Sequence, residues 1–306
     1  MTSVELLAAI VAMRTRRRPG GYAPLIVLVV SAFVFVGLGV LRWELTFVLS
    51  FLAAIFVHET GHVLAMRLFR YRDLRMMFIP FIGGMAGGDP DDLDAGRIAA
   101  ISLAGPLIGL LGGLTAAGLA HLTGIEDFRH FGWISLYLNL FNLLPLVPLD
   151  GGHFINELLF ARRPRAELVF KAVALVALAA IIIVSKFYIL GVVVVLMLTT
   201  IRSDYRMAVA IEALRSNPVL AGGALTGPKV EQLRAMLERV TPALLAEANR
   251  EKLPAGVWEA WIKVKKLFPP PRWVARLFGT YAFVLLVLAP LTWLALSLGT
   301  GVVPVP

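Results

Sequence analysis

The pattern of hydrophobic and polar residues along the chain predicts a series of membrane-spanning helices. A helix needs roughly 20 consecutive apolar residues to cross a bilayer. Runs near this length occupy residues 24–41, 45–66, 97–120, 131–149, 168–184, 187–201 and 277–299. The fifth and sixth runs are interrupted only around Lys186, and we predict two short helices there because one helix over 168–201 would be too long. The pattern therefore predicts an all-α polytopic membrane protein with about six to seven transmembrane helices.

The polar segments between these runs divide the chain into four predicted domains. The apolar part of the N-terminus precedes its arginine cluster, the reverse of the order in a signal peptide, so a helix on the membrane surface is expected. Residues 228–240 begin with proline and carry apolar residues at helical spacing. The predicted domains are an N-terminal cytoplasmic amphipathic segment (1–21), a transmembrane core (22–201), a cytoplasmic helical domain (202–276) and a last transmembrane helix with a short tail (277–306).

The segment after the second predicted span has a different pattern. Residues 76–82 are apolar but too few to cross a membrane, and several glycines follow them. Backbone that is not helical is tolerated at membrane depth only where protein shields it. We therefore predict a hairpin or re-entrant segment within residues 76–88, with a simple interfacial connector as an equally weighted alternative.

Composition and charge agree with a membrane protein and indicate its orientation. Hydrophobic residues make up 58% of the 306 residues and charged residues 16%, and the mean hydropathy is +0.81. With the N-terminus in the cytoplasm, all of the 29 lysines and arginines except Arg42, Arg129 and Lys186 fall on the cytoplasmic side, as the positive-inside rule requires. This placement in the lipid bilayer explains the net charge of +9, and no nucleic-acid partner is predicted.

The second predicted span contains three ionisable side chains, which are rare inside membranes unless they have a function. His58 and His62 are one helical turn apart and share a face, so both imidazoles can bind one zinc ion, and Glu59 can act as a general base toward water. The alternative is a set of polar residues satisfied between packed helices. Because the chain has no cysteine, thiolate zinc sites, iron–sulfur clusters and disulfides are excluded.

A catalytic zinc site needs a third protein ligand, and Asp150 is the candidate. It lies at the cytoplasmic end of the fourth predicted span, the side of the bilayer on which His58 and His62 also lie. Pro145 would break regular helix just before it, and Gly151 would let the backbone approach a neighbour closely. The alternative for Asp150 is a helix-end carboxylate in the headgroup region.

Two motifs together resemble the signatures of the site-2 protease family of intramembrane zinc metalloproteases. These are HETGH, at residues 58–62, and NLLPLVPLDGG, at residues 142–152, and the SLAGPLIG stretch at 102–109 is similar to a further family element. The resemblance implies zinc held by His58, His62 and Asp150, Glu59 as the base and Asn142 near the active site. It also implies cleavage of a peptide bond in or near the transmembrane helix of membrane-anchored regulatory proteins, in the plasma membrane of a prokaryote, with residues 76–88 offering a strand edge to the substrate.

A different class of function remains as the alternative to proteolysis. A non-proteolytic membrane metal-binding or transport protein could use the same residues, but a transporter should carry polar residues through the outer halves of several spans. The outer halves of the first, third, fifth and seventh spans carry almost none. Gly105, Gly109 and Gly113 recur every fourth residue, and we predict that they serve close helix packing without a catalytic role. His153 is not predicted to act in the site.

Overall fold

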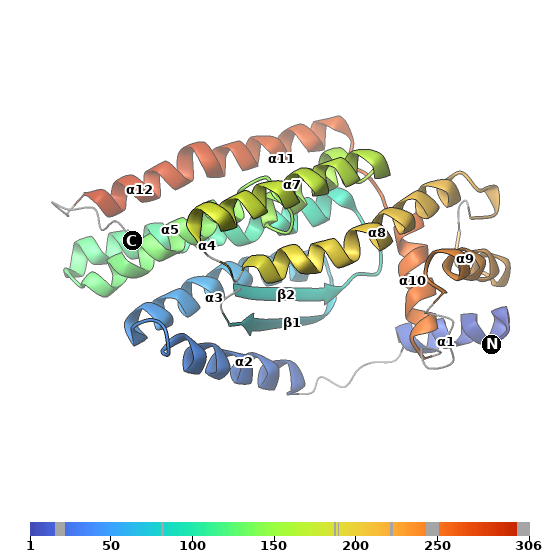
Figure 1. Ribbon diagram of the computed structural model, residues 1–306, viewed down its shortest axis with the longest axis horizontal. Coiled ribbons are helices and arrows are strands. Elements are labelled where there is room, and N and C mark those ends of the chain that lie inside the picture. Colours follow the sequence, from blue (N-terminus) through green and yellow to red (C-terminus); the bar gives the residue numbers. More distant parts are fainter. Residues whose placement is uncertain are drawn as a thin grey trace.

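The computed structural model describes residues 1–15, 22–80, 83–186, 188, 190–220, 223–242 and 251–298. Over these residues the structure consists of helices with one pair of strands between the third and the fourth helix (Figure 1). In chain order the elements are α1 (Ser3–Thr15), α2 (Ala23–Gly39), α3 (Leu45–Leu68), β1 (Arg72–Ile79), β2 (Gly83–Asp89), α4 (Ala95–Thr123), α5 (Glu126–Asn142), α6 (Asp150–Ile155), the π-helix η1 (Asn156–Phe160), α7 (Pro164–Ser185), α8 (Leu190–Arg215), η2 (Pro218–Leu220), α9 (Gly227–Val240), α10 (Leu253–Val264), α11 (Pro271–Phe283), the π-helix η5 (Val284–Leu288) and α12 (Ala289–Ser297).

Four of the described helices are long and apolar enough to cross a membrane. They are α3, α4, α7 and the continuous helix Pro271–Ser297, which α11, η5 and α12 form together. These helices correspond to the second, third, fifth and seventh predicted spans, so a predominantly helical membrane protein is confirmed. α2 and α5 have only 17 residues each, and α8 acquires charged residues in its second half. Their crossing of the membrane, and the total of six to seven spans, stay predictions.

The segment after α3 is a β-hairpin, as the prediction of a hairpin or re-entrant segment allowed, so the fold is not purely helical. β1 and β2 pair antiparallel, with Met76 opposite Ala86 and Ile79 opposite Gly83. β1 packs on α2, where the Phe78 amide donates to the Ser31 hydroxyl at 3.0 Å. Residues 81 and 82, which belong to the predicted apolar segment, lie outside the described residues.

The centre of the molecule is built on α4, which packs between α3 and α5. The helix begins where the Asp94 carboxylate accepts a hydrogen bond from the Arg97 amide, and it ends at Gly124, whose φ of 71° is accessible to glycine at no cost. A Cβ at Gly61 of α3 would lie 2.8 Å from the Ala104 carbonyl carbon. The two helices therefore meet backbone to backbone at this point, in the manner of small-residue packing between membrane helices.

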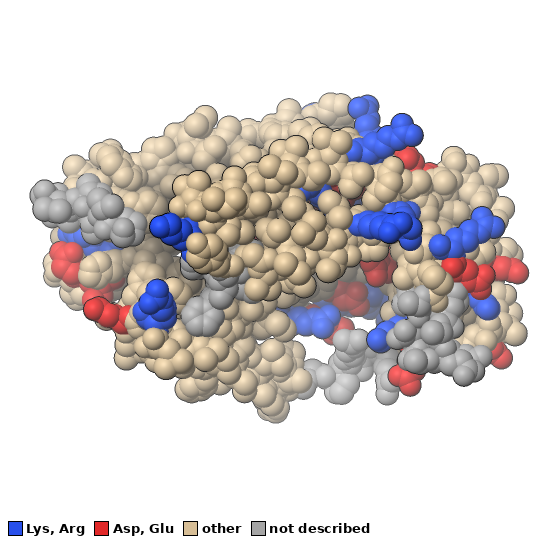
Figure 2. Space-filling view, viewed as in Figure 1, with Lys and Arg blue, Asp and Glu red and all other residues tan. Residues whose placement is uncertain are grey.

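A hydrophobic cluster formed by α1, α9, α10 and the end of α8 lies at the end of the molecule that holds the N-terminus (Figure 1). Leu6 and Ile10 of α1 are fully buried against α9 and α10, so the predicted amphipathic N-terminal segment packs on protein. The remainder of its arginine cluster, residues 16–21, lies outside the described residues. Charged side chains gather mainly at this end, whereas the face over α7 and α8 is largely uncharged (Figure 2). The division suits a chain that spans a bilayer beside a water-exposed helical part.

Arg14, at the end of α1, connects this cluster to the hairpin. Its guanidinium forms ion pairs with Asp89, at 3.1 Å, and with Asp91, and it lies 4.6 Å from the ring centroid of Trp258 in α10. The Arg14 side chain is nearly buried by these contacts. The Arg14 guanidinium therefore connects α1 to the end of β2 and to α10.

Candidate metal centre

The polar side chains of α3 project from the second half of that helix into the protein. His58, Glu59 and His62 are 4%, 6% and 8% exposed, so they are shielded from any lipid around the helix. The two imidazoles lie one turn apart, as predicted, and their Nε2 atoms are 3.1 Å from each other. Both rings thus present the same nitrogen to one point beside α3.

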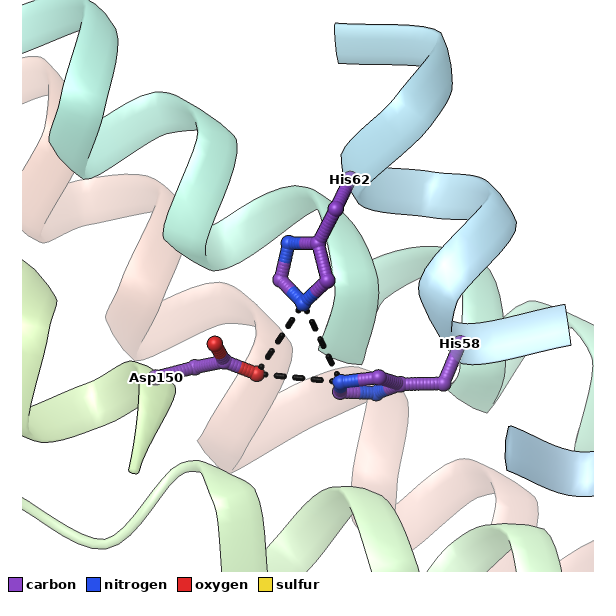
Figure 3. A group of neighbouring side chains, drawn as sticks. All are labelled: His58, His62 and Asp150. Atoms are coloured by element: carbon purple, nitrogen blue, oxygen red, sulfur yellow. Dashed lines mark hydrogen bonds and ion pairs between the residues drawn. The ribbon is translucent and has the colours of Figure 1, made fainter. Parts of the chain in front are cut away.

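Asp150 reaches the same point from the first residue of α6. α5 ends at Asn142, and the irregular segment that follows folds back on itself before α6 begins. A Cβ at Gly151 would lie 2.5 Å from the Leu143 carbonyl carbon, so only glycine allows this return. The Asp150 Oδ2 atom then lies 3.1 Å from His58 Nε2 and 3.3 Å from His62 Nε2 (Figure 3).

The outer nitrogens of the two rings determine what this group of atoms can bind. His62 Nδ1 lies 2.8 Å from the Ile101 carbonyl oxygen of α4, and His58 Nδ1 lies 2.7 Å from the side-chain oxygen of Asn139 in α5. Both partners are acceptors, so each Nδ1 must donate, and in the neutral rings each Nε2 carries a lone pair. The buried Asp150 Oδ2 finds no hydrogen-bond partner in the described part of the chain. Three electron-rich atoms therefore face one another, and a cation between them relieves their repulsion.

The spacing of these atoms fits a metal ion. A tetrahedral zinc site with bonds of roughly 2.0–2.1 Å has ligand atoms about 3.3 Å apart. The three separations in the protein are 3.1, 3.1 and 3.3 Å. Two imidazole nitrogens and one carboxylate oxygen also form a ligand set that zinc accepts, with a fourth position left open. His58, His62 and Asp150 could therefore hold a metal ion.

Glu59 lies beside this group without belonging to it, and the hairpin holds its carboxylate. A Cβ at Gly84 of β2 would lie 2.5 Å from Glu59 Cγ and 2.7 Å from Oε1, so the strand can lie against the side chain only where it carries no side chain of its own. The backbone amide of Ala86, on the same strand, also lies near the carboxylate. Glu59 is thus placed next to the candidate metal position by contacts from another element.

Two further residues considered in the sequence lie apart from these contacts. The Asn142 amide nitrogen donates to the Leu138 carbonyl of its own helix at 3.0 Å. Asn139, one turn earlier, contacts His58 instead. His153 is exposed. The structure therefore brings together His58, His62, Asp150 and Glu59, with Asn139 as a neighbour that the sequence analysis missed. Its signal was a polar residue within an apolar predicted span.

The glycines of α4 do more than the helix packing predicted for them. A Cβ at Gly105 would lie 2.5 Å from His62 Cε1 and closer still to Nε2, and a Cβ at Gly109 would lie 2.5 Å from Asn139 Cγ. Gly113 has the ordinary packing role, with its nearest neighbours 3.4 Å away. The surface of α4 that faces the candidate metal position therefore carries no side chains at Gly105 and Gly109, and His62 and the Asn139 amide occupy the space that is left.

A helical membrane protein with a His–His–Asp group at this spacing has the features of a membrane metalloprotein, and comparisons with known proteins show which metalloproteins it resembles. Residues 119–184, which include Asp150, match peptidase family M50. The chain is 29% identical over 133 residues to stage IV sporulation protein FB of Bacillus subtilis, covering 43% of this chain and 46% of that protein. It is 27% identical over 135 residues to zinc metalloprotease MJ0392 of Methanocaldococcus jannaschii, covering 41% and 39%. The chain thus spans less than half the length of these relatives, and its resemblance to the site-2 protease family is confirmed.

Proposed function

We propose that this protein is an intramembrane zinc metalloprotease that hydrolyses a peptide bond within or near the transmembrane helix of membrane-anchored regulatory proteins. The observation that carries the proposal is the convergence of His58 Nε2, His62 Nε2 and Asp150 Oδ2 at the spacing of a zinc tetrahedron. The Glu59 carboxylate lies close enough to these three residues to interact with them electrostatically, and the similarity to zinc metalloproteases supports the same chemistry.

Each residue has one part in the proposed reaction. His58, His62 and Asp150 hold the zinc ion, which when bound polarises a carbonyl group and acidifies a water molecule. Glu59 accepts a proton from the attacking water and delivers it to the leaving amine, which a carboxylate held beside the reacting atoms can do. Asn142 hydrogen-bonds the substrate backbone or the developing oxyanion once its contact to Leu138 is exchanged. Burial of the group strengthens these electrostatic interactions.

The orientation of the chain determines from which side water and substrate reach the site. The distribution of lysine and arginine supports a cytoplasmic N-terminus and a cytoplasmic domain over residues 202–276. The plasma membrane of a prokaryote is the proposed location, because the similar metalloproteases come from a bacterium and an archaeon. α3 then runs from outside to inside, and His58 and His62 lie in its second half. The zinc position is therefore below the cytoplasmic surface of the bilayer, and water enters from that side.

The substitution Glu59→Gln tests the proposal. The variant serves first as a trap: captured single-span membrane proteins of the native cell are identified by mass spectrometry and then incubated with the wild-type protein in liposomes. The wild type is expected to cleave a captured protein, and Glu59→Gln to lose cleavage while its zinc content stays at the wild-type level, because Glu59 is not a ligand.

Three results would contradict parts of this account. Activity retained in Glu59→Gln excludes the proposed base, and zinc lost from that variant makes Glu59 a ligand. A wild-type protein that holds zinc but cleaves none of the captured proteins is a metal-binding protein of the non-proteolytic class.

A further inference from the structure

Asn139 of α5 carries a polar amide at a fully buried position. The residue is 0% exposed, and its helix neighbour Leu136 is fully buried as well. A buried amide whose hydrogen bonds are not made costs about 1–3 kcal/mol. In Asn139 both ends of the amide are engaged: Oδ1 lies 2.7 Å from His58 Nδ1, and Nδ2 donates to the Ser135 carbonyl at 2.6 Å.

The contacts of Nδ2 fix which way the amide points. The Ser135 carbonyl oxygen can only accept, so the amide atom that faces it must be the nitrogen. The Ser135 hydroxyl donates to the Gly109 carbonyl of α4 at 2.7 Å, and its oxygen is a second acceptor for Nδ2 at 3.3 Å. The flipped amide would put Oδ1 against both oxygens. The oxygen of Asn139 is therefore directed at His58 by contacts that do not involve His58 at all.

The packing of α4 leaves the amide no other place. A Cβ at Gly109 would lie 2.5 Å from Asn139 Cγ, and the amide nitrogen and oxygen are closer still. The side chain thus fills a slot whose wall is the backbone of α4. The chain of contacts runs from the Gly109 carbonyl through the Ser135 hydroxyl and the Asn139 amide to the ring of His58.

We propose that Asn139 is the positioning residue for His58, because its fixed oxygen requires a proton on Nδ1 and so leaves the Nε2 lone pair for the metal. The inference rests on the proposed function for the role of the metal, but the tautomer follows from the protein contacts alone. A hydrogen bond to the ring nitrogen that does not bind the metal orients a metal-binding histidine, and removing its partner lowers metal affinity by roughly 10–100-fold. Asn139 acts through His58 and touches no reacting atom.

The substitution Asn139→Leu removes the acceptor and keeps a side chain of similar size. Asn139→Asp keeps an oxygen toward Nδ1. Thr292→Val is the matched control, because Thr292 is equally buried in the same bundle and its hydroxyl bonds only to Leu288 of its own helix turn among the contacts described. Each protein is purified in detergent, and its zinc affinity is measured by competition with a chelator.

The second measurement reads the tautomer directly. The protein is labelled with 15N-histidine, and the ring nitrogens are observed at about pH 8, where an ordinary imidazole is neutral. The His58 signals are identified by their loss in His58→Gln. We expect the wild type to carry the proton on Nδ1 with and without zinc, and Asn139→Leu to carry it on Nε2 without zinc and to bind zinc about 10–100-fold more weakly. Asn139→Asp should keep the Nδ1 proton, and Thr292→Val should match the wild type in both measurements.

The outcomes separate this inference from the proposed function. A wild-type His58 with its proton on Nε2, or a folded Asn139→Leu that binds zinc as tightly as the wild type, overturns the role of Asn139. A wild type that shows the Nδ1 proton but binds no zinc supports the role of Asn139 and contradicts the zinc protease. If Asn139→Leu does not fold, the wild-type tautomer decides the question.

Discussion

Replacing Gly105 by alanine should displace His62 from the candidate metal position without changing any polar residue. The new Cβ would lie 2.5 Å from His62 Cε1, whereas ordinary contact begins at 3.4 Å, so the ring must retreat by about 1 Å. It cannot retreat freely, because its Nδ1 bonds to Ile101, and α3 cannot move away while Gly61 packs on Ala104. Metal–ligand distances tolerate only about 0.2 Å.

The expected effect is a loss of zinc affinity of more than about 100-fold, beyond what the removal of an outer contact causes. Overpacking should also lower the free energy of unfolding by about 1–3 kcal/mol. Gly118→Ala is the matched control, because it lies on the same helix and a Cβ there meets no atom within 4 Å. Metal analysis and chelator competition measure zinc, and thermal melting followed by circular dichroism verifies the fold. A folded Gly105→Ala protein with wild-type zinc affinity would refute the placement of His62.

Three other outcomes are expected. Asp150→Ala should lose zinc and activity, whereas His153→Ala should keep most of both; zinc content that follows His153 and ignores Asp150 would show that the third ligand is misassigned. Gly84→Ala should lower the cleavage rate by at least about 100-fold with zinc retained, because the new Cβ displaces the Glu59 carboxylate; equal loss of zinc would mean that the hairpin supports the metal and not the base. Mass spectrometry of substrate fragments should place the cut in the cytoplasmic half of the substrate helix, and a cut in its outer third would contradict the proposed orientation.

The residues that meet at the candidate site were predictable where chemistry and spacing coincide in the sequence. His58 and His62 share a helix face at any i, i+4 spacing, so their approach required only that residues 45–66 be helical. Predicting the place of Asp150 also required knowing on which side of the membrane the second and fourth predicted spans end. The distribution of lysine and arginine indicates that side. The structure brings these three together.

Features that depend on contacts between distant elements were not predictable in this way. The bond from Asn139 to His58 joins α5 to α3, and nothing local to Asn139 indicates its partner. The contact of Gly84 with Glu59 requires the hairpin, whose second strand reads GGMAGGD and lacks the alternation that identifies a strand. For the same reason the sequence left a simple connector open as an alternative there. The sequence could not show whether Gly105 is glycine to make room for His62 or only to allow close helix packing, because either role requires a residue without a side chain.

The assembly of this site from many elements has a consequence for folding. The candidate ligand atoms come from α3 and α6, and the groups that orient them come from α4 and α5. An ion held by all of them binds only the assembled chain, so at a free concentration of about 100 times its dissociation constant it would stabilise that state by roughly 2.7 kcal/mol. A chain that has entered the bilayer but whose helices have not yet packed has neither the ion nor the geometry for the proposed reaction. The proposed hydrolytic activity would therefore arise only with correct assembly, and an unfinished molecule would not act on the membrane proteins around it.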